Sequence, residues 1–190
     1  EPGTRRGTTS PAPTSRGRPL TTMRWQVRDL ARIGITAALA VVIGLALKAV
    51  PLPRMPYGGS LSLESLPILY LAFTHSAGAA GAAGALCGLI QLAFGAHIYH
   101  PIQILLDYPL AFGLLGLAGR LRPIPLGCLL GGSARFVAHF TSGVVFFAAY
   151  APEGTPVWIY SALYNALYLL PEIILSALIL PILLRRTAST

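Results

Sequence analysis

Long apolar runs separated by short polar stretches dominate the sequence from Ile33 onward. A membrane-spanning helix needs about 20 mainly apolar residues, and all but one of the runs approach or exceed that length. The predicted spans cover residues 33–50, 63–74, 77–96, 101–119, 124–149 and 157–184. The second run is short and contains an acid and a proline, so we expect it to begin partly outside the hydrocarbon. The pattern predicts an all-α membrane protein with six transmembrane helices.

The composition supports this fold class. Of the 190 residues, 54% are hydrophobic and only 11% are charged, and the mean hydropathy is +0.66. Typical water-soluble domains carry about 25% charged residues. Cys87 and Cys128 both lie inside apolar runs, where packing is a better explanation than a disulfide framework.

The basic residues are distributed as topology signals. Seven arginines lie at or before Arg32, and the others that matter for topology are Arg120, Arg122, Arg185 and Arg186. Such clusters between apolar runs orient membrane proteins, whereas a nucleic-acid site would gather them on one folded surface. We therefore expect no nucleic-acid partner, and we predict that both termini are cytoplasmic. The loops around Tyr57, around His97 to His100 and around Glu153 then face outward.

Residues 1–23 differ from the rest of the chain. They are rich in Pro, Thr, Ser, Gly and Arg, which is typical of a disordered basic tail. Met23 ends this tail, so an upstream start and an artificial addition both explain it. Residues 24–190 form the predicted membrane domain.

One acidic residue in the fourth run is the strongest candidate for a binding group. His100, Gln103 and Asp107 are three and seven residues apart, so they share one face of a helix. A charge at the centre of a membrane helix costs about 2.5 to 3.5 kcal/mol, and such groups usually face a protein interior, a cavity or a substrate. We predict that Asp107, with Tyr108 beside it, binds a ligand.

The fifth and sixth runs also carry polar side chains. Arg135 and His139 are four residues apart on one helix face, and Tyr160 and Asn165 lie in the sixth run. At 1.5 Å per residue, the polar groups of the three runs can meet in the outer half of the membrane. Glu172 lies deeper, where it can neutralise Arg135. An ion pair that only holds helices together is therefore an alternative to ligand binding for Arg135.

The polar groups indicate the kind of ligand. A carboxylate, an amide, a histidine and several aromatic rings in an apolar pocket suit a small, flat, cationic molecule that forms hydrogen bonds. His97 and His100 are three residues apart but lack a third acidic ligand nearby, so we expect a capping or interfacial role and no metal site.

Two other classes of function remain open from these residues. An intramembrane enzyme could use Asp107, His139 and Glu172 as acid and base groups. A purely structural subunit would bind no small ligand. The sequence has no Gly-rich phosphate loop, so we expect no ATP hydrolysis by this chain.

Small residues recur on two runs. Gly34 and Ala38 are four apart in the first run, and Gly84 and Gly88 are four apart in the third. This spacing lets helices approach closely in lipid. Packing inside the bundle and docking of another membrane subunit both explain it.

Three motifs resemble those of a known family. They are Met55-Pro-Tyr-Gly-Gly-Ser-Leu-Ser-Leu-Glu-Ser-Leu-Pro67, His100-Pro-Ile-Gln-Ile-Leu-Leu-Asp-Tyr-Pro109 and Arg135-Phe-Val-Ala-His-Phe-Thr-Ser-Gly143. The chain from about Arg24 to Arg186 resembles the thiamine-specific S component of energy-coupling factor (ECF) transporters. The resemblance implies a six-helix thiamine-binding subunit of the bacterial plasma membrane without cofactors. It also implies partners: a transmembrane coupling subunit and two ATPase subunits that use ATP.

The resemblance also implies roles for particular residues. Ligand-binding positions of the family match Asp107, Tyr108, Arg135, His139, Tyr160 and Asn165, and the docking positions match Gly34 and Ala38. Some members have tryptophans where this chain has Gly58, beside Tyr57, and Phe147. We expect Tyr57 and Phe147 to provide the stacking here. Intact thiamine and a pyrimidine precursor are both possible ligands.

Overall fold

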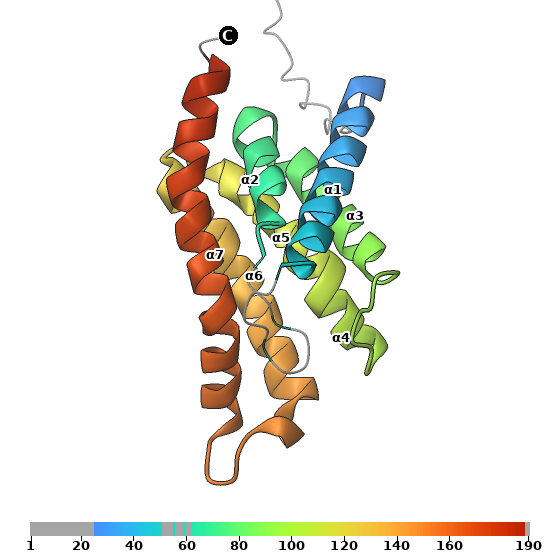
Figure 1. The fold of residues 1–190 in the computed structure, drawn as a ribbon, viewed down its shortest axis with the longest axis vertical. Helices are drawn as coiled ribbons and strands as arrows, with labels where there is room; N and C mark the ends of the chain where they lie inside the picture. The colour runs from blue at the N-terminus through green and yellow to red at the C-terminus, as the bar shows by residue number, and fades with distance from the viewer. Residues whose placement is uncertain (1–24, 51–54, 56–58, 60–61, 189–190) are drawn as a thin grey trace, which may run out of the picture.

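The computed structural model describes residues 25–50, 55, 59 and 62–188, which form a helical bundle (Figure 1). In chain order the elements are α1 (Val27–Lys48), α2 (Ser65–Thr74), α3 (Ala77–Gln91), α4 (Pro101–Leu105), η2 (Leu106–Leu110), α5 (Ala111–Leu114), η3 (Leu115–Arg120), α6 (Ile124–Phe146), η4 (Ala148–Tyr150) and α7 (Val157–Ala188). Within these described ranges the chain forms helices and no strand, so the all-α prediction is confirmed. The predicted tail, residues 1–23, lies outside the described residues.

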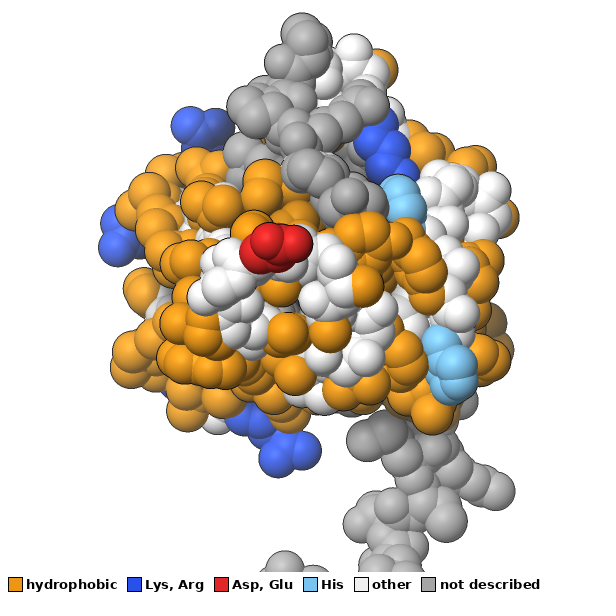
Figure 2. All heavy atoms as spheres, turned by 90° about the horizontal axis from the view of Figure 1, so that it is seen from below, with side chains coloured by type: hydrophobic (Ala, Val, Ile, Leu, Met, Phe, Trp, Pro, Cys, Tyr) orange, Lys and Arg blue, Asp and Glu red, His pale blue; other side chains and the backbone are white. Residues whose placement is uncertain are grey.

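The surface of the bundle is that of a membrane protein. By length and composition, three helical segments are able to cross a membrane: Val27–Lys48, Pro101–Arg120 and Val157–Thr187. Two shorter apolar helices are α2 and α3. Ile35, Leu167 and Leu178 are each more than 60% exposed, which suits contact with lipid and not with water. Hydrophobic side chains cover most of the face seen in Figure 2.

Some helix ends differ from the predicted ones for local reasons. Helix α1 begins at Val27, before the predicted start, because Gln26 and Asp29 form a reciprocal capping box there. Helix α3 ends at Gln91, before the predicted end at residue 96, and a turn follows. Gly95 in that turn has φ of 84°, a conformation that residues with a Cβ rarely adopt.

Helix α3 packs against α1, α2 and the segment 101–120. Its alanines Ala79, Ala80 and Ala83 are fully buried. Cys87 and Cys128 are buried free thiols, so their predicted packing role is confirmed.

Two glycines of α3 let the next segment pack directly on its backbone. A Cβ at Gly84 would overlap the Phe112 carbonyl group, and a Cβ at Gly88 would overlap the Tyr108 carbonyl group. The predicted packing role of this small-residue pair is therefore confirmed within the bundle. The contact also fixes the depth of the segment that carries Asp107.

The fourth helical segment widens into a π-helix over Leu106–Leu110. Pro109 lies inside this turn and has no backbone N–H to donate, so the regular α-helical hydrogen-bond pattern is interrupted there. Asp107 and Tyr108 are both in the widened turn. Short π-helical stretches of this kind often occur at functional sites.

Candidate functional site

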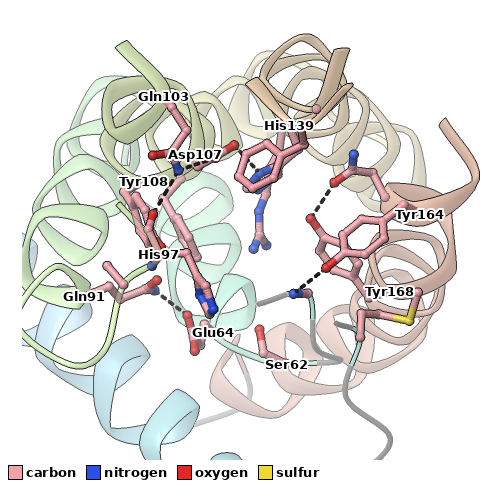
Figure 3. Close-up of a pocket in the computed structure, with 18 of the residues that line it drawn as sticks. Ser62, Glu64, Gln91, His97, Gln103, Asp107, Tyr108, His139, Tyr164 and Tyr168 are labelled. Atoms are coloured by element: carbon pink, nitrogen blue, oxygen red, sulfur yellow. Dashed lines mark hydrogen bonds and ion pairs between the residues drawn. The ribbon is translucent and has the colours of Figure 1, made fainter. Parts of the chain in front are cut away.

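A cavity of about 430 Å³ opens among the helices and the two loops that follow α1 and α3. Its volume lies within the range of small-molecule sites, about 300–1,000 Å³. The predicted site residues that line it are Asp107, Tyr108, Arg135, His139, Phe147, Tyr160 and Asn165. Figure 3 shows how several of these side chains surround one space. Tyr57, the remaining predicted ligand residue, lies outside the described residues.

Asp107 is held by side chains from two helical segments. Its Oδ2 accepts hydrogen bonds from Nε2 of Gln103 at 2.7 Å and from Oγ of Ser142 at 2.8 Å. Its Oδ1 lies 3.2 Å from Nδ1 of His139. Because Oδ2 already has two donors, Oδ1 is the oxygen with more capacity for a further partner.

His139 connects the carboxylate to the aromatic wall of the cavity. Its ring meets that of Tyr168 edge to face, with centroids 6.2 Å apart. The side chain is only 12% exposed, and among the described residues no group bonds its buried Nε2. A neutral ring that donates from Nδ1 to Asp107 offers Nε2 as an acceptor. A ligand donor at this position would satisfy a buried polar atom.

Helix α7 contributes an amide and tyrosines. Oδ1 of Asn165 accepts from the Tyr168 hydroxyl at 2.7 Å, and its Nδ2 donates to the Ser161 carbonyl group at 2.9 Å. The Tyr164 hydroxyl accepts from the backbone N–H of Gly59 at 3.0 Å, which ties part of the first loop to α7. Among the described residues, one N–H of the Asn165 amide has no partner closer than Ser161 Oγ at 3.4 Å and can serve a ligand.

An aromatic cluster adjoins the cavity at the end of α6. Phe147 lines the cavity and meets Tyr99 edge to face, with centroids 5.0 Å apart. The hydroxyl groups of Tyr99 and Tyr150 are 3.0 Å apart. These contacts hold the Phe147 ring, which is the one that we expect to stack on a ligand.

The two outer histidines have different positions. His100 caps α4, since its Nδ1 accepts from the backbone N–H of Ile102 at 3.1 Å, and the predicted capping role is confirmed. His97 instead lines the cavity. Within the described parts of the chain, no three His, Cys, Asp or Glu side chains are grouped as a metal site would require.

Arg135 and Glu172 form a buried ion pair. Nη1 of Arg135 lies 3.1 and 3.2 Å from the two carboxylate oxygens of Glu172, and the side chains are 6% and 2% exposed. Ser65 Oγ donates to Glu172 at 2.6 Å, and the guanidinium lies 4.2 Å above the Phe112 ring. Glu172 is not among the residues that line the cavity, whereas Arg135 is. The predicted neutralisation of Arg135 by Glu172 is confirmed.

Sequence reasoning missed a second acid in the cavity. Glu64 is only 7% exposed, lines the cavity and accepts a short hydrogen bond from Nε2 of Gln91. A Cβ at Gly44 of α1 would overlap the Glu64 carboxylate, so the glycine provides the space for it. The available signal was an acid directly before an apolar run. Lys48 also lines this part of the cavity.

The predicted docking residues lie on the outer surface of α1. Ala38 is exposed and Gly34 is half-buried. A Cβ at Gly34 would meet nothing within 4 Å, so the glycine does not serve packing among the described residues. Ile35 and Leu39 flank the position and are 69% and 49% exposed.

The chain matches known proteins over most of its length. It is 36% identical to the thiamine transporter ThiT of Bacillus subtilis (strain 168) over 176 residues, which cover 83% of this chain and 91% of that protein. It is 29% identical to the thiamine transporter ThiT of Lacticaseibacillus paracasei, over 79% and 85% of the two chains. A solved structure of ThiT from Listeria monocytogenes superposes with a TM-score of 0.75 at 26% identity, covering 86% of this chain and 96% of that one. The family model described as thiamine transporter protein (Thia_YuaJ) matches residues 30–190, and the chain therefore belongs to this family.

Proposed function

We propose that this protein is the thiamine-binding S component of an ECF transporter, which captures thiamine outside the cell and delivers it through partner subunits. One observation carries the proposal. Asp107 of η2, His139 of α6 and Asn165 of α7 line the same cavity in a chain of the thiamine transporter family. Convergence of these groups from three helical segments is what a small, flat, cationic ligand requires.

Thiamine suits the chemistry of the cavity. It joins an aminopyrimidine ring to a cationic thiazolium ring. Asp107 faces the cation or the amino group, and the Nε2 atom of His139 accepts from a ligand donor. Asn165 and Tyr160 bind the polar edges of the pyrimidine. Removing these groups from water costs free energy unless the ligand satisfies them, and this cost gives specificity.

The remaining predicted ligand residues complete this arrangement. Phe147 and Tyr57 stack on the two rings, and Tyr108 closes the side of the site next to Asp107. Arg135 is paired with Glu172. Its positive charge at the cavity lining is therefore compensated. A purely anionic ligand is disfavoured, because Asp107 and Glu64 both line the cavity.

We place the protein in the bacterial plasma membrane with six spans and both termini in the cytoplasm. The six spans correspond to α1, α2, α3, the continuous segment 101–120, α6 and α7. The start of α1 and the end of α7 lie at one end of the bundle in Figure 1, as an even number of crossings requires. Basic residues flank that end, in agreement with the preference for positive charge on the cytoplasmic side.

The energy for uptake comes from partners in this proposal. The sequence lacks a Gly-rich phosphate loop, so a transmembrane coupling subunit and two ATPase subunits supply ATP hydrolysis. Gly34 and Ala38 form the docking position for the coupling subunit. The open space beside Gly34, where a Cβ would meet nothing within 4 Å, supports this role, because a side chain of a partner helix fits there.

The protein is a transport subunit and not an enzyme. The acid–base set Asp107, His139 and Glu172 does not assemble, because Glu172 is bound by Arg135 and Ser65 outside the cavity lining. A pyrimidine precursor of thiamine is the nearest alternative ligand, since it retains the groups that Asn165 and Asp107 recognise.

Isothermal titration calorimetry of the detergent-purified protein tests the proposal. We expect thiamine to bind with a Kd between about 1 nM and 1 μM, which corresponds to a standard free energy of binding of about −12 to −8 kcal/mol. Riboflavin is the negative control, and the pyrimidine precursor is titrated in parallel. Calorimetry is preferable to tryptophan fluorescence, because Trp25 and Trp158 do not line the cavity. Failure to bind either thiamine or its precursor would refute the proposed function.

A further inference from the structure

Gln103 lines the cavity and donates a hydrogen bond to the Asp107 carboxylate. It is 1% exposed, although its side chain is polar and lies in an apolar helical segment. Its Nε2 donates to Oδ2 of Asp107 at 2.7 Å and to the His97 carbonyl group at 3.1 Å. Its Oε1 accepts from the Tyr99 backbone N–H at 3.1 Å. One side chain therefore bonds both Asp107 and the loop that follows α3.

That loop forms one wall of the cavity. Residues 92–100 connect α3 to α4, and the lining residues among them are Phe94, Gly95, Ala96 and His97. The backbone N–H of His97 donates to the Tyr108 hydroxyl at 2.9 Å. Together with the two bonds from Gln103, this contact fastens the loop to the same turn that carries Asp107. Figure 3 shows His97, Gln103, Asp107 and Tyr108 side by side on this wall.

The amide of Gln103 fits its surroundings in one orientation only. Its NH₂ group faces two acceptors, the Asp107 carboxylate and the His97 carbonyl group, while its oxygen faces the N–H donor of Tyr99. A flipped amide would set oxygen against oxygen on one side and N–H against N–H on the other. A glutamate at this position would donate nothing when ionised and would repel Asp107. A leucine would leave the same buried groups without partners.

We propose that Gln103 is a positioning residue that couples the 92–100 loop to the Asp107 carboxylate. The cavity wall and the binding group then adopt the ligand-binding arrangement together. This inference rests on the proposed function for its ligand, since Asp107 is taken to bind thiamine. It gives Gln103 a role beyond packing: ligand binding at Asp107 stabilises the loop, and the fastened loop keeps Asp107 oriented.

Ser142 provides a matched comparison. Its Oγ donates to the same Oδ2 atom of Asp107 at 2.8 Å, but it lies on α6 and is not bonded to the loop in the described structure. Ser142→Ala therefore removes one donor to the carboxylate and leaves the bonds between Gln103 and the loop in place. Gln26→Leu is a control for the Gln→Leu change, because Gln26 lies at the start of α1 and does not line the cavity.

Hydrogen–deuterium exchange and calorimetry on the full-length protein test the coupling. Without ligand, we expect exchange of the amides of residues 96–99 to be at least about tenfold faster in Gln103→Leu than in the wild type. Ser142→Ala and Gln26→Leu should keep wild-type exchange there. Thiamine should slow exchange of these amides in the wild type and in Ser142→Ala, and much less in Gln103→Leu. The Kd for thiamine should rise at least about tenfold in Gln103→Leu and less in Ser142→Ala.

The possible outcomes are separable. Wild-type exchange of residues 96–99 in Gln103→Leu would overturn the coupling, even if the affinity fell. If Gln103→Leu does not fold, Gln103→Met serves as the second variant, because it keeps the length of the side chain without charge and removes the amide donor and acceptor, and it should show the same faster exchange. The comparison without ligand does not need thiamine. A wild-type protein that binds no thiamine, yet shows the predicted difference in exchange, would therefore refute the proposed function while the structural link between Gln103 and the loop stands.

Discussion

At the scale of single residues, the acids Asp107 and Glu172 have different surroundings. Asp107 is 16% exposed at its side chain and contacts donors from neutral groups and a histidine. Glu172 is 2% exposed and meets the guanidinium of Arg135. A buried acid with its own arginine is already compensated, whereas one without a full counter-charge can attract a cation. We therefore propose ligand binding for Asp107 and a structural role for Glu172.

We expect Asp107→Asn to raise the Kd for thiamine at least about tenfold, or about 1.4 kcal/mol, because the change removes the negative charge and keeps the size. Calorimetry in detergent measures the effect. Glu153→Gln is the matched control, since Glu153 is exposed in the loop between α6 and α7 and does not line the cavity. Equal affinity in both variants would remove Asp107 from the binding site.

Glu172→Gln should destabilise the protein and leave the cavity-lining Arg135 without its counter-charge. Removing one partner of a buried ion pair costs about 3–5 kcal/mol, because Arg135 remains buried without a counter-charge. A lower midpoint of thermal unfolding in detergent is the expected result. The thiamine affinity of the folded protein should also fall, because Arg135 lines the cavity and its uncompensated positive charge would oppose a cationic ligand. A midpoint matching that of Glu153→Gln would contradict the structural role.

At the scale of elements, the contact between α3 and the π-helical turn sets the position of the Asp107 carboxylate. The turn rests on the backbone of α3 at Gly88, where a Cβ would overlap the carbonyl group of Tyr108 and approach the nitrogen of Pro109. Both opposing groups are backbone atoms, so they cannot rotate away as a flexible side chain can. The position of Tyr108 and the adjacent Asp107 therefore depends on Gly88, which does not line the cavity.

Gly88→Ala should lower both stability and thiamine affinity. Overpacking a buried contact costs about 1–3 kcal/mol, and relief of the overlap moves Tyr108 and the adjacent Asp107. Thermal unfolding and calorimetry on the same preparation measure the two effects. Gly34→Ala is the control, because its Cβ would meet nothing within 4 Å, and it should leave stability unchanged within about 0.5 kcal/mol. Unchanged affinity in Gly88→Ala would show that the turn is placed by other contacts.

At the scale of the whole molecule, sequence patterns predicted which helices contribute residues to the candidate site. They did not predict which loop residues line it. Asp107, His139 and Asn165 are detectable because polar groups inside apolar runs need a partner or a ligand, and helical spacing predicts their faces. The π-helical turn at Leu106–Leu110 was not predicted, because its geometry depends on packing against α3, which the pattern of apolar residues does not show. Glu64 was predicted only as part of the second span, whereas it lines the cavity.

The contacts that sequence patterns did not predict have one feature in common, a large separation along the chain. Glu64 meets Gln91 across 27 positions, and Gly59 meets Tyr164 across 105. No periodicity within a helix reports on contacts between a loop and a distant helix. The Gln103 side chain was recognised as part of a polar stripe, but its bonds to His97 and Tyr99 depend on the path of the loop. Patterns along the chain therefore predict helix faces, while loop contacts require the three-dimensional structure.

The open space beside Gly34 of α1 provides a test of how the protein docks with its proposed partners. Gly34→Leu places a large side chain where a partner helix is expected to approach, at a position where an added Cβ would meet no described group within 4 Å outside its own helical turn. Thiamine binding by the isolated subunit should be unchanged, because Gly34 does not line the cavity. Co-purification with the coupling subunit and thiamine uptake in cells should both fall at least about tenfold. Leu167→Trp on the exposed face of α7 is the control for added bulk in lipid. Uptake at the wild-type rate in Gly34→Leu would place the docking surface elsewhere on the bundle, whereas loss of uptake in both variants would indicate a general effect on insertion into the membrane.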